Sequence, residues 1–403
     1  MLASQIGGST PAFELDGIEE RKISPCEISD LEKSDRIERC RSEMRKQRVA
    51  QLILVPGANL EYFTDVHWHP SERLLCAVIT LSGPIHWIAP EFEVPRLQQM
   101  LNLPGMIHGW HEEYDPFALL ASVIRSGAGA GKAIMLDEAA PFIFADRLQR
   151  SVPDYSVSLA SPITNAIRSI KSSAEIGIIS AVMRMTLEVQ RRTARILRED
   201  ISSSEVAEFI DAAHRRLVGA PSTFCIVSFG DQTAYPHGGA AEQRLRPNDM
   251  VLIDTGSDLF GYKSDLTRSY VFGSANDKQR RIWNIEKEAQ LAAFEAARIG
   301  QPCEAVDYAA RSVLSSHGLG PDYQIPGLPH RTGHGLGMEL HEHPYIVRGN
   351  KDSLRSGMCF SNEPMICIYG EFGVRLEDHM YMTDTGPAWF TEPAVSIDRP
   401  FPI

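Results

Sequence analysis

The chain has 403 residues, of which 43% are hydrophobic, and a formal net charge of −12. A single hydrophobic core stops growing below this length, so we expect two domains. The acidic balance argues against nucleic acid as a partner, because proteins that bind phosphate backbones usually present a basic face. There is no apolar run of about 18 residues, so we expect a soluble protein without a membrane span.

The N-terminal segment and the cysteines bear on cellular location. Residues 1–30 contain no apolar stretch of signal-peptide length, and we expect them to form an arm that wraps around the protein or stays mobile. The seven cysteines are odd in number and form no CxxC pair, which favours scattered reduced thiols. These features predict a cytoplasmic protein.

Residues 31–162 alternate helical patterns with short apolar runs. A helix is predicted over residues 37–51, and strands over residues 51–55, 76–81 and 85–89. This alternation is typical of an α/β sandwich, which we expect for the N-terminal domain.

A glycine-rich stretch at residues 127–132 looks at first like a phosphate-binding loop. It lacks the first glycine at the required spacing, and Ala133 stands where Ser or Thr must contact Mg²⁺. We therefore expect an ordinary loop before a strand at residues 133–136.

The domain boundary is predicted near residues 159–165. Residues 167–176 have the pattern of a strand, a serine cap and the start of a helix. Long helical patterns follow among several strands, which is typical of an α+β domain over residues 163–403. The predicted helices cover residues 175–198, 203–217, 277–299 and 303–316.

Two aspartates in this C-terminal half are expected to meet on a hairpin. An apolar run that begins at Val251 ends in Asp254, and a second run follows Asp265. Gly256 and Gly261 bracket a Ser-Asp-Leu-Phe segment that suits a turn, so the two strands would bring both carboxylates together.

Three further side chains complete a set of metal-binding types. His334 lies between Gly333 and Gly335, which would let the backbone approach a ligand closely, and Glu363 and Glu377 follow in chain order. Each residue alone is a weak signal, because a lone His, Asp or Glu is more often structural. The ordered set of four carboxylates and one imidazole is what two divalent cations need.

In order and spacing, these segments resemble the metallopeptidase family with the pita-bread fold, over residues 165–395. That family includes Xaa-Pro dipeptidases (prolidases), aminopeptidase P, methionine aminopeptidases and the metal-free creatinases. The matching segments are Ile-Asp-Thr-Gly at 253–256, Gly-Tyr-Lys-Ser-Asp-Leu-Thr-Arg at 261–268, Gly-His-Gly-Leu-Gly at 333–337, Leu-His-Glu-His-Pro at 340–344, Asn-Glu-Pro at 362–364 and Arg-Leu-Glu-Asp at 375–378. The implied architecture is an α+β pita-bread catalytic domain after a smaller α/β N-terminal domain.

The resemblance implies a role for each residue of the set. Asp254 would bind one metal ion, His334 and Glu363 the other, and Asp265 and Glu377 would bridge the two. Mn²⁺, Zn²⁺ and Co²⁺ are the expected ions. A water or hydroxide between them would be the nucleophile, since two such cations lower the pKa of a shared water and stabilise an oxyanion. Glu363 would also shuttle the proton.

The resemblance also implies an outer site of three histidines and an arginine. His237 and His341 would hold the substrate carbonyl, and Arg375 lies two positions before Glu377. His330 also falls where the proline-specific branch often has an imidazole, although a structural role is as well supported. Arg375 could equally be a structural partner of Asp378.

One position departs from the proline-specific pattern. Relatives commonly carry Tyr four residues after the second-metal Glu, whereas this chain has Cys367 there and Tyr369 two positions later. The missing hydroxyl puts one transition-state hydrogen bond in question, and donors of that kind are typically worth about 2.7–4 kcal/mol.

The expected activity is hydrolysis of the Xaa-Pro bond in dipeptides or short peptides. Retention of all four carboxylates argues against a metal-free creatinase, and the long N-terminal half argues against a methionine aminopeptidase. Two alternatives stay open: a hydrolase or lyase that acts on a small non-peptide substrate, such as creatine or a sulfonium compound, and a binding module that has lost catalysis.

The family resemblance also implies a homodimer in which the N-terminal domain of one subunit covers the active site of the other. The loop at residues 65–73 contains two His, one Trp and one Arg, and it could form that lid or be an ordinary surface loop.

Overall fold

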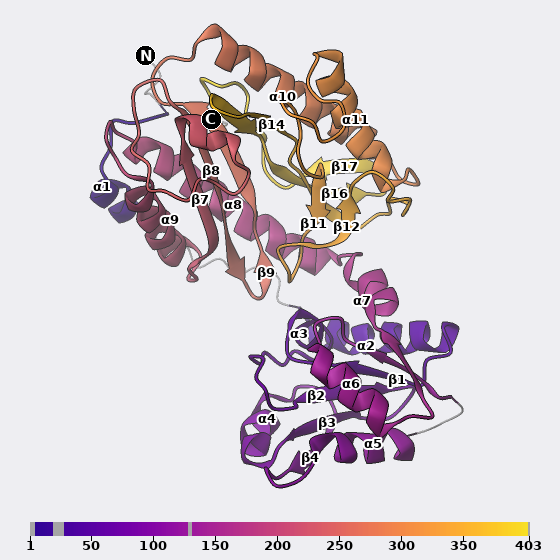
Figure 1. Ribbon diagram of the computed structural model, residues 1–403. Coiled ribbons are helices and arrows are strands. Elements are labelled where there is room, and N and C mark those ends of the chain that lie inside the picture. Colours follow the sequence, from indigo (N-terminus) through magenta and orange to yellow (C-terminus); the bar gives the residue numbers. More distant parts are fainter. Residues whose placement is uncertain (1–4, 19–27, 128–130, 402–403) are drawn as a thin grey trace. The chain divides into compact units, whose positions relative to one another are not determined.

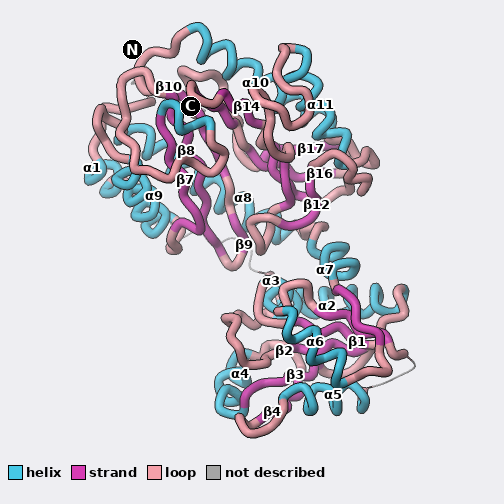
Figure 2. Tube along the Cα trace, viewed as in Figure 1, coloured by secondary structure: helices cyan, strands magenta, loops and turns pink. Residues whose placement is uncertain are grey.

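The computed structural model describes residues 5–18, 28–127 and 131–401, and it divides into two compact units. The N-terminal unit spans Ile28–Arg168. The second unit joins Ser169–Ile403 to the segment Met1–Glu27, and we call it the catalytic unit because all the predicted site residues lie in it. Figure 1 shows the elements of each unit coloured along the chain, and Figure 2 distinguishes helices from strands.

The N-terminal unit is built on a six-stranded mixed sheet with the order β4-β3-β2-β1-β5-β6. Strand β2 runs antiparallel to both of its neighbours, and the other pairs are parallel. The strands are β1 (Gln51–Leu54), β2 (Cys76–Thr80), β3 (Ile85–Pro90), β4 (Gly105–Trp110), β5 (Ala133–Leu136) and β6 (Ser156–Leu159).

Helices pack on this sheet and confirm the α/β prediction. The core contains Ile53, Val78 and Ile88 from the strands and Phe117 and Ile124 from a helix, all fully or almost fully buried. The helices are α2 (Asp30–Lys46), α3 (Ala58–Thr64), a 3₁₀ turn (Glu91–Glu93), α4 (Val94–Met100), α5 (Pro116–Ser126), α6 (Phe142–Ser151) and α7 (Ser161–Arg168). The glycine-rich stretch of residues 127–132 lies partly outside the described residues.

The strand predicted at residues 167–170 is wrong. Residues up to Arg168 belong to α7, in which Ile163, Thr164, Ile167 and Arg168 are buried at helical spacing. The serine cap is confirmed, because Ser172 and Glu175 form a reciprocal capping box at the start of the next helix.

The catalytic unit contains three sheets. One has the order β10-β8-β7 with β9 paired to β8, one has the order β12-β11-β13-β16-β17, and β14 pairs with β15. The strands are β7 (Ser222–Phe229), β8 (Met250–Leu259), β9 (Tyr262–Lys263), β10 (Leu266–Val271), β11 (Gly333–Gly335), β12 (Glu342–Ile346), β13 (Cys359–Asn362), β14 (Met365–Ile368), β15 (Phe372–Arg375), β16 (Asp378–Thr383) and β17 (Gly386–Trp389).

Long helices line these sheets, as predicted for an α+β unit. Their starts are set by side-chain caps, for example Ser202 with Glu205 and Asn276 with Gln279. The helices are α1 (Pro11–Asp16), α8 (Ser173–Ile196), α9 (Ser203–Leu217), a 3₁₀ turn (Gly230–Ala234), α10 (Asp277–Ala296) and α11 (Cys303–Ser316). None of the helices in the described chain is long and apolar enough to cross a membrane.

The described part of the N-terminal arm folds onto the catalytic unit. Gly7 donates a backbone hydrogen bond to Ala194 at the end of α8, and the buried Glu14 forms ion pairs with Arg192 and Arg195. In the same way Gln5 donates a hydrogen bond to the carbonyl of Phe401 at 3.0 Å. Residues 5–18 are therefore an integral part of this unit.

Candidate metal centre

The first two predicted ligand residues lie on the predicted hairpin. Strands β8 and β10 are antiparallel, with Asp254 opposite Thr267, and Asp265 directly precedes β10. The turn lies at Phe260 and Gly261, both with positive φ, rather than over the four residues after Gly256.

Gly256 lies within strand β8, whereas the sequence predicted it at the start of the turn. A Cβ on Gly256 would overlap the backbone carbonyl of Ser264. The glycine therefore lets the two arms of the hairpin approach each other at the level of Asp254 and Asp265.

The other three predicted ligand residues come from the five-stranded sheet and its edge. His334 is the central residue of β11, Glu363 follows β13, and Glu377 lies between β15 and β16. A Cβ on Gly333 would overlap the carbonyl of Ser361, and one on Gly335 would overlap that of His343. The glycines thus serve close packing of β11 against its neighbours, not the approach of a ligand.

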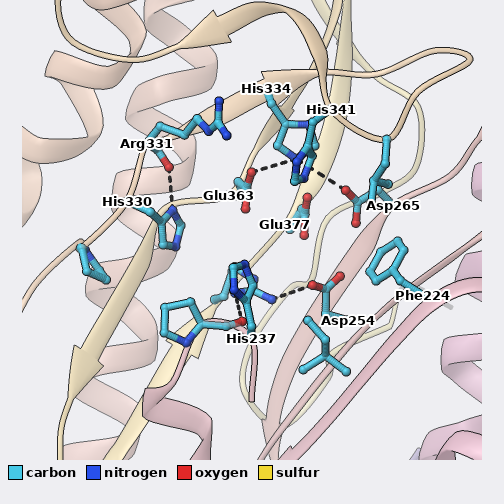
Figure 3. A pocket seen from close by; sticks show the side chains of 15 residues that line it. Phe224, His237, Asp254, Asp265, His330, Arg331, His334, His341, Glu363 and Glu377 are labelled. Carbon is cyan, nitrogen blue, oxygen red and sulfur yellow. Dashed lines mark hydrogen bonds and ion pairs between the residues drawn. The ribbon is translucent and has the colours of Figure 1, made fainter. Parts of the chain in front are cut away.

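One pocket of about 660 Å³ brings together every residue predicted for the site (Figure 3). It is lined by the five predicted ligands, the predicted outer residues and several apolar side chains: Phe224, Ile226, Pro236, His237, Asp254, Asp265, Pro329, His330, Arg331, His334, Leu340, His341, Glu363, Arg375 and Glu377. Cys367 is buried in the hydrophobic core and is not among these residues.

His334 lies close to two of the predicted carboxylate ligands. Its Nε2 atom is 3.0 Å from Oε1 of Glu363 and 3.6 Å from Oδ2 of Asp265. Ser361 holds this arrangement, because its hydroxyl donates to Oε1 of Glu363 at 3.0 Å and accepts from the His334 backbone N–H at 2.8 Å. Burial opposes ionisation of Glu363, but His334, His330 and Arg375 together outweigh it and lower the pKa of Glu363.

Arg375 organises the opposite side of the pocket. Its Nη2 donates to Oδ2 of Asp254 at 2.6 Å, and its Nη1 donates to the carbonyl of Pro236 at 2.8 Å. Its Nε donates to the hydroxyl of Thr267 at 3.1 Å, which donates in turn to Oε2 of Glu377 at 2.6 Å. Asp378, the other partner considered for Arg375, pairs instead with the buried Arg268 at 2.7 Å.

The donor set fits divalent cations. Oδ1 of Asp254 and Oε1 of Glu377 are buried and have no hydrogen-bond partner among the described residues, although the second oxygen of each carboxylate is bonded. Burial, and next the negative charge of Glu377, raise the pKa of Asp265 well above its usual value. Buried carboxylates that repel one another and keep free oxygens are suited to hard or borderline cations.

The three predicted outer histidines line the same pocket in different ways. His237 and His341 are exposed at the pocket, and the ring of His341 lies 4.0 Å from that of His334 between centroids. Desolvation, and next the neighbouring His334, lower the pKa of His341 to about 4. His330 donates from Nδ1 to the carbonyl of Arg331 at 2.7 Å, which leaves its buried Nε2 without a partner in the described structure.

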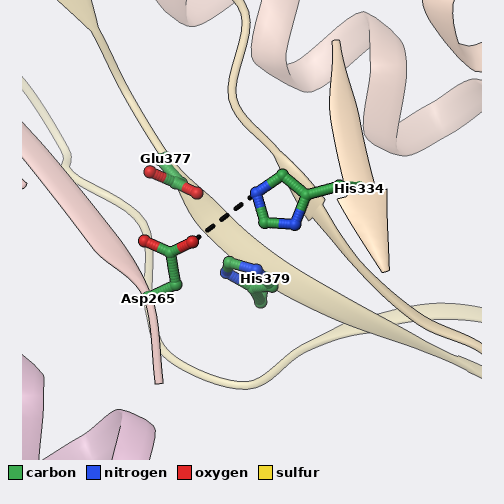
Figure 4. Close-up of side chains that lie close together, drawn as sticks. All are labelled: Asp265, His334, Glu377 and His379. Carbon is green, nitrogen blue, oxygen red and sulfur yellow. Dashed lines mark ion pairs between the residues drawn. The ribbon is translucent and has the colours of Figure 1, made fainter. Parts of the chain in front are cut away.

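Sequence analysis missed two residues that contact the predicted ligands. Thr267 bonds Glu377, and the fully buried His379 lies in a group with Asp265, His334 and Glu377 whose ligand atoms are all within 4.8 Å of one another (Figure 4). The available signal for His379 was its place two residues after Glu377, which puts both side chains on one face of an extended strand. Burial, and next the adjacent His334, lower the pKa of His379 well below its usual value.

Comparisons with known proteins agree with this fold. The model of the Creatinase/Prolidase N-terminal domain matches residues 36–170, and the model of Metallopeptidase family M24 matches residues 177–384. A "Probable dipeptidase PepE" of Mycobacterium tuberculosis is 33% identical over 341 residues, which is 84% of this chain and 88% of that protein.

Solved structures give the same result. A prolidase from Thermococcus sibiricus shares 30% identity with a TM-score of 0.81, over 90% of this chain and 98% of that one. Dipeptidase PepE from Mycobacterium ulcerans shares 30% identity with a TM-score of 0.83, over 89% and 95% of the two chains.

The pita-bread fold, with a buried group of carboxylates and histidine in its pocket, defines a metallopeptidase. The chain belongs to metallopeptidase family M24 and carries the creatinase/prolidase type of N-terminal domain. The fold class and family expected from the sequence are therefore confirmed.

Proposed function

We propose that this protein hydrolyses the Xaa-Pro bond of dipeptides or short peptides with two divalent metal ions. The observation that carries the proposal is the convergence of Asp254, Asp265, His334, Glu363 and Glu377 in one pocket that His237, His341 and Arg375 also line. The similar prolidase and dipeptidase structures support the same reaction class.

We divide the five predicted ligands between the two metal ions. Asp254 would bind one ion through its free Oδ1, and His334 and Glu363 would bind the other. Asp265 and Glu377 would bridge them. Mn²⁺, Zn²⁺ or Co²⁺ would supply a water of lowered pKa and an electrostatic partner for the developing oxyanion.

The remaining pocket residues would handle the substrate and the proton. Glu363 would accept a proton from the attacking water at a carboxylate oxygen and pass it to the proline nitrogen that leaves. His237 and His341 are exposed at the pocket, where an imidazole N–H could donate to the carbonyl oxygen of the scissile bond. We assign His330 and Arg375 to substrate binding as well, with Arg375 acting mainly by holding Asp254.

Proline recognition is supported by the walls of the pocket. Phe224, Ile226 and Leu340 offer apolar surface for a ring that has no N–H to donate. A peptidase that binds its substrate as an added β-strand needs that N–H, so a shaped apolar pocket is the alternative.

The test compares Ala-Pro and Gly-Pro with Ala-Ala and with the tripeptide Ala-Pro-Gly. After chelation, the protein should regain Xaa-Pro hydrolysis on addition of Mn²⁺, Zn²⁺ or Co²⁺, and Asp265→Ala should not. Asp384→Ala, at an exposed turn between β16 and β17, is the matched control and should behave as the wild type. Full activity of Asp265→Ala after chelation would refute the metal mechanism, and turnover of a non-peptide substrate alone would favour the lyase or hydrolase alternative.

We further propose a cytoplasmic homodimer in which residues 65–73 of one subunit cover the pocket of the other. Trp68 of this loop contacts α4, because the guanidinium of Arg96 lies over its ring at 4.4 Å from the centroid. Light scattering should give twice the monomer mass, and Trp68→Ala should change KM without changing metal content.

A further inference from the structure

His379 lies beside three of the five predicted ligands but is not one of the five. Side chains alternate along a strand, so Glu377 and His379 face one side at the start of β16 while Asp378 faces the other and pairs with Arg268. The pairing of β16 with β13 also places His379 near the predicted ligands. His379 lies directly opposite Ser361 of β13, the residue that holds His334 and Glu363.

The imidazole of His379 is unsatisfied within the part of the chain that the structure describes. It is fully buried, and neither ring nitrogen has a hydrogen-bond partner among the described residues. A buried polar group without a partner is destabilising, so an unmet donor or acceptor at this depth calls for a ligand.

The ring points into the predicted metal centre. In Figure 4 it lies beneath the gap between Asp265 and His334, with Glu377 on the far side. The rings of His334 and His379 meet edge to face with centroids 5.8 Å apart. One ligand atom from each of these four residues can be chosen so that all lie within 4.8 Å of one another, a spacing that a single ion can join.

We propose that His379 is a second imidazole ligand, on the His334 side of the metal centre. This inference rests on the proposed function and refines it. The ion on that side would have His334 and His379 as nitrogen ligands together with Glu363, whereas the ion bound by Asp254 would have oxygen ligands alone.

Unequal donor sets would give the two positions different metal preferences. Imidazole suits Zn²⁺, Co²⁺ and Ni²⁺, while carboxylate suits Mn²⁺ and Mg²⁺. The two positions should therefore fill in sequence in a Zn²⁺ titration, with the His379 position first, and a mixture of Zn²⁺ and Mn²⁺ should yield a mixed-metal protein.

The experiment compares the full-length wild type with His379→Asn, which removes the imidazole. The metal-free proteins are titrated with Zn²⁺ against a chromophoric chelator, and the tighter Zn²⁺ site should weaken by at least about tenfold in the variant. X-ray absorption at the zinc edge of the fully loaded proteins should show two imidazoles per two zinc ions in the wild type and one in the variant.

His214→Asn is the matched control. His214 is also fully buried in the catalytic unit, but both of its ring nitrogens have partners, Ser222 at 2.9 Å and Thr186 at 3.3 Å. Its zinc affinity and imidazole count should equal those of the wild type. If His379→Asn does not fold, His379→Gln, which keeps more of the side-chain length, takes its place.

The outcomes separate the two proposals. A wild-type protein that binds no divalent ion would end the proposed function. A wild type that binds two zinc ions with a single imidazole would overturn the role of His379 and leave the proposed function intact, even if His379→Asn weakened binding indirectly.

Discussion

Arg375 and Asp254 form a buried pair in which Nη2 donates to Oδ2 at 2.6 Å, so that Oδ1 of Asp254 is left free. The guanidinium also reaches Pro236 and Thr267, so one planar group fixes a carboxylate, a loop carbonyl and a hydroxyl at once. A lysine has a single terminal nitrogen and cannot reproduce this fork.

Arg375→Lys should therefore disorder Asp254 without removing any proposed ligand. We expect metal affinity to fall by about 10–100-fold, the usual effect of losing a residue that orients a ligand. Competition with a chelator measures the metal affinity. Arg215→Lys, on the exposed face of α9, serves as the control. Unchanged affinity in Arg375→Lys would show that Asp254 needs no such support.

Removal of metal should lower thermal stability. Burial raises the pKa of both Asp265 and Glu377, and the neighbouring negative charges, Glu377 for Asp265 and Glu363 for Glu377, raise it further. Bound cations would relieve this repulsion. A ligand present at 100 times its Kd stabilises by about 2.7 kcal/mol, so calorimetry should show a lower Tm in chelator and recovery on metal addition. The Tm of Asp265→Asn should respond less to both treatments, and an equal response would point to metal bound elsewhere.

His214 predicts a sensitivity to acid. Its burial lowers the pKa from 6.5 to about 4, so the unfolded chain takes up a proton before the folded one as the pH falls. The stability from neutral His214 is fully present above pH 6.5 and is lost towards pH 4, at most roughly 3 kcal/mol. Denaturant unfolding at several pH values should give a shallower loss for His214→Asn across this window, and parallel curves would contradict the assignment.

Cys367 should be dispensable for catalysis. It is buried in the hydrophobic core and does not line the pocket, and burial raises the pKa of its thiol to about 12, which keeps it protonated and unreactive. Cys367→Ala should keep kcat/KM while it lowers stability by about 1 kcal/mol through loss of buried volume. A tenfold fall in kcat would instead place the thiol in the reaction.

Local signals explain which elements could be predicted. The helices at residues 203–217 and 303–316 were predicted with the bounds that the structure shows. Both have regular apolar periodicity, and the first begins at a capping box. Helix α7 was missed because its eight residues follow a strand and carry only two turns of the pattern.

Contacts between distant residues explain what the sequence could not predict. The residues predicted as ligands could be selected because they form an ordered set of short motifs that resembles a known family. The bond from Thr267 to Glu377 joins residues 110 positions apart. His379 is distinguished from a core histidine by its register with Ser361 and its place beside Asp265 and His334, which only the fold reveals. The docking of residues 5–18 on α8 depends on the same kind of long-range pairing.

The glycines at 256, 333 and 335 limit how the site can be redesigned. Because each is pressed against a neighbouring carbonyl, the strands that carry Asp254 and His334 pack through main chain alone and tolerate no added methyl group. Phe224, Ile226 and Leu340, in contrast, present side chains to the pocket. Efforts to change substrate choice should therefore vary these three side chains and keep the three glycines.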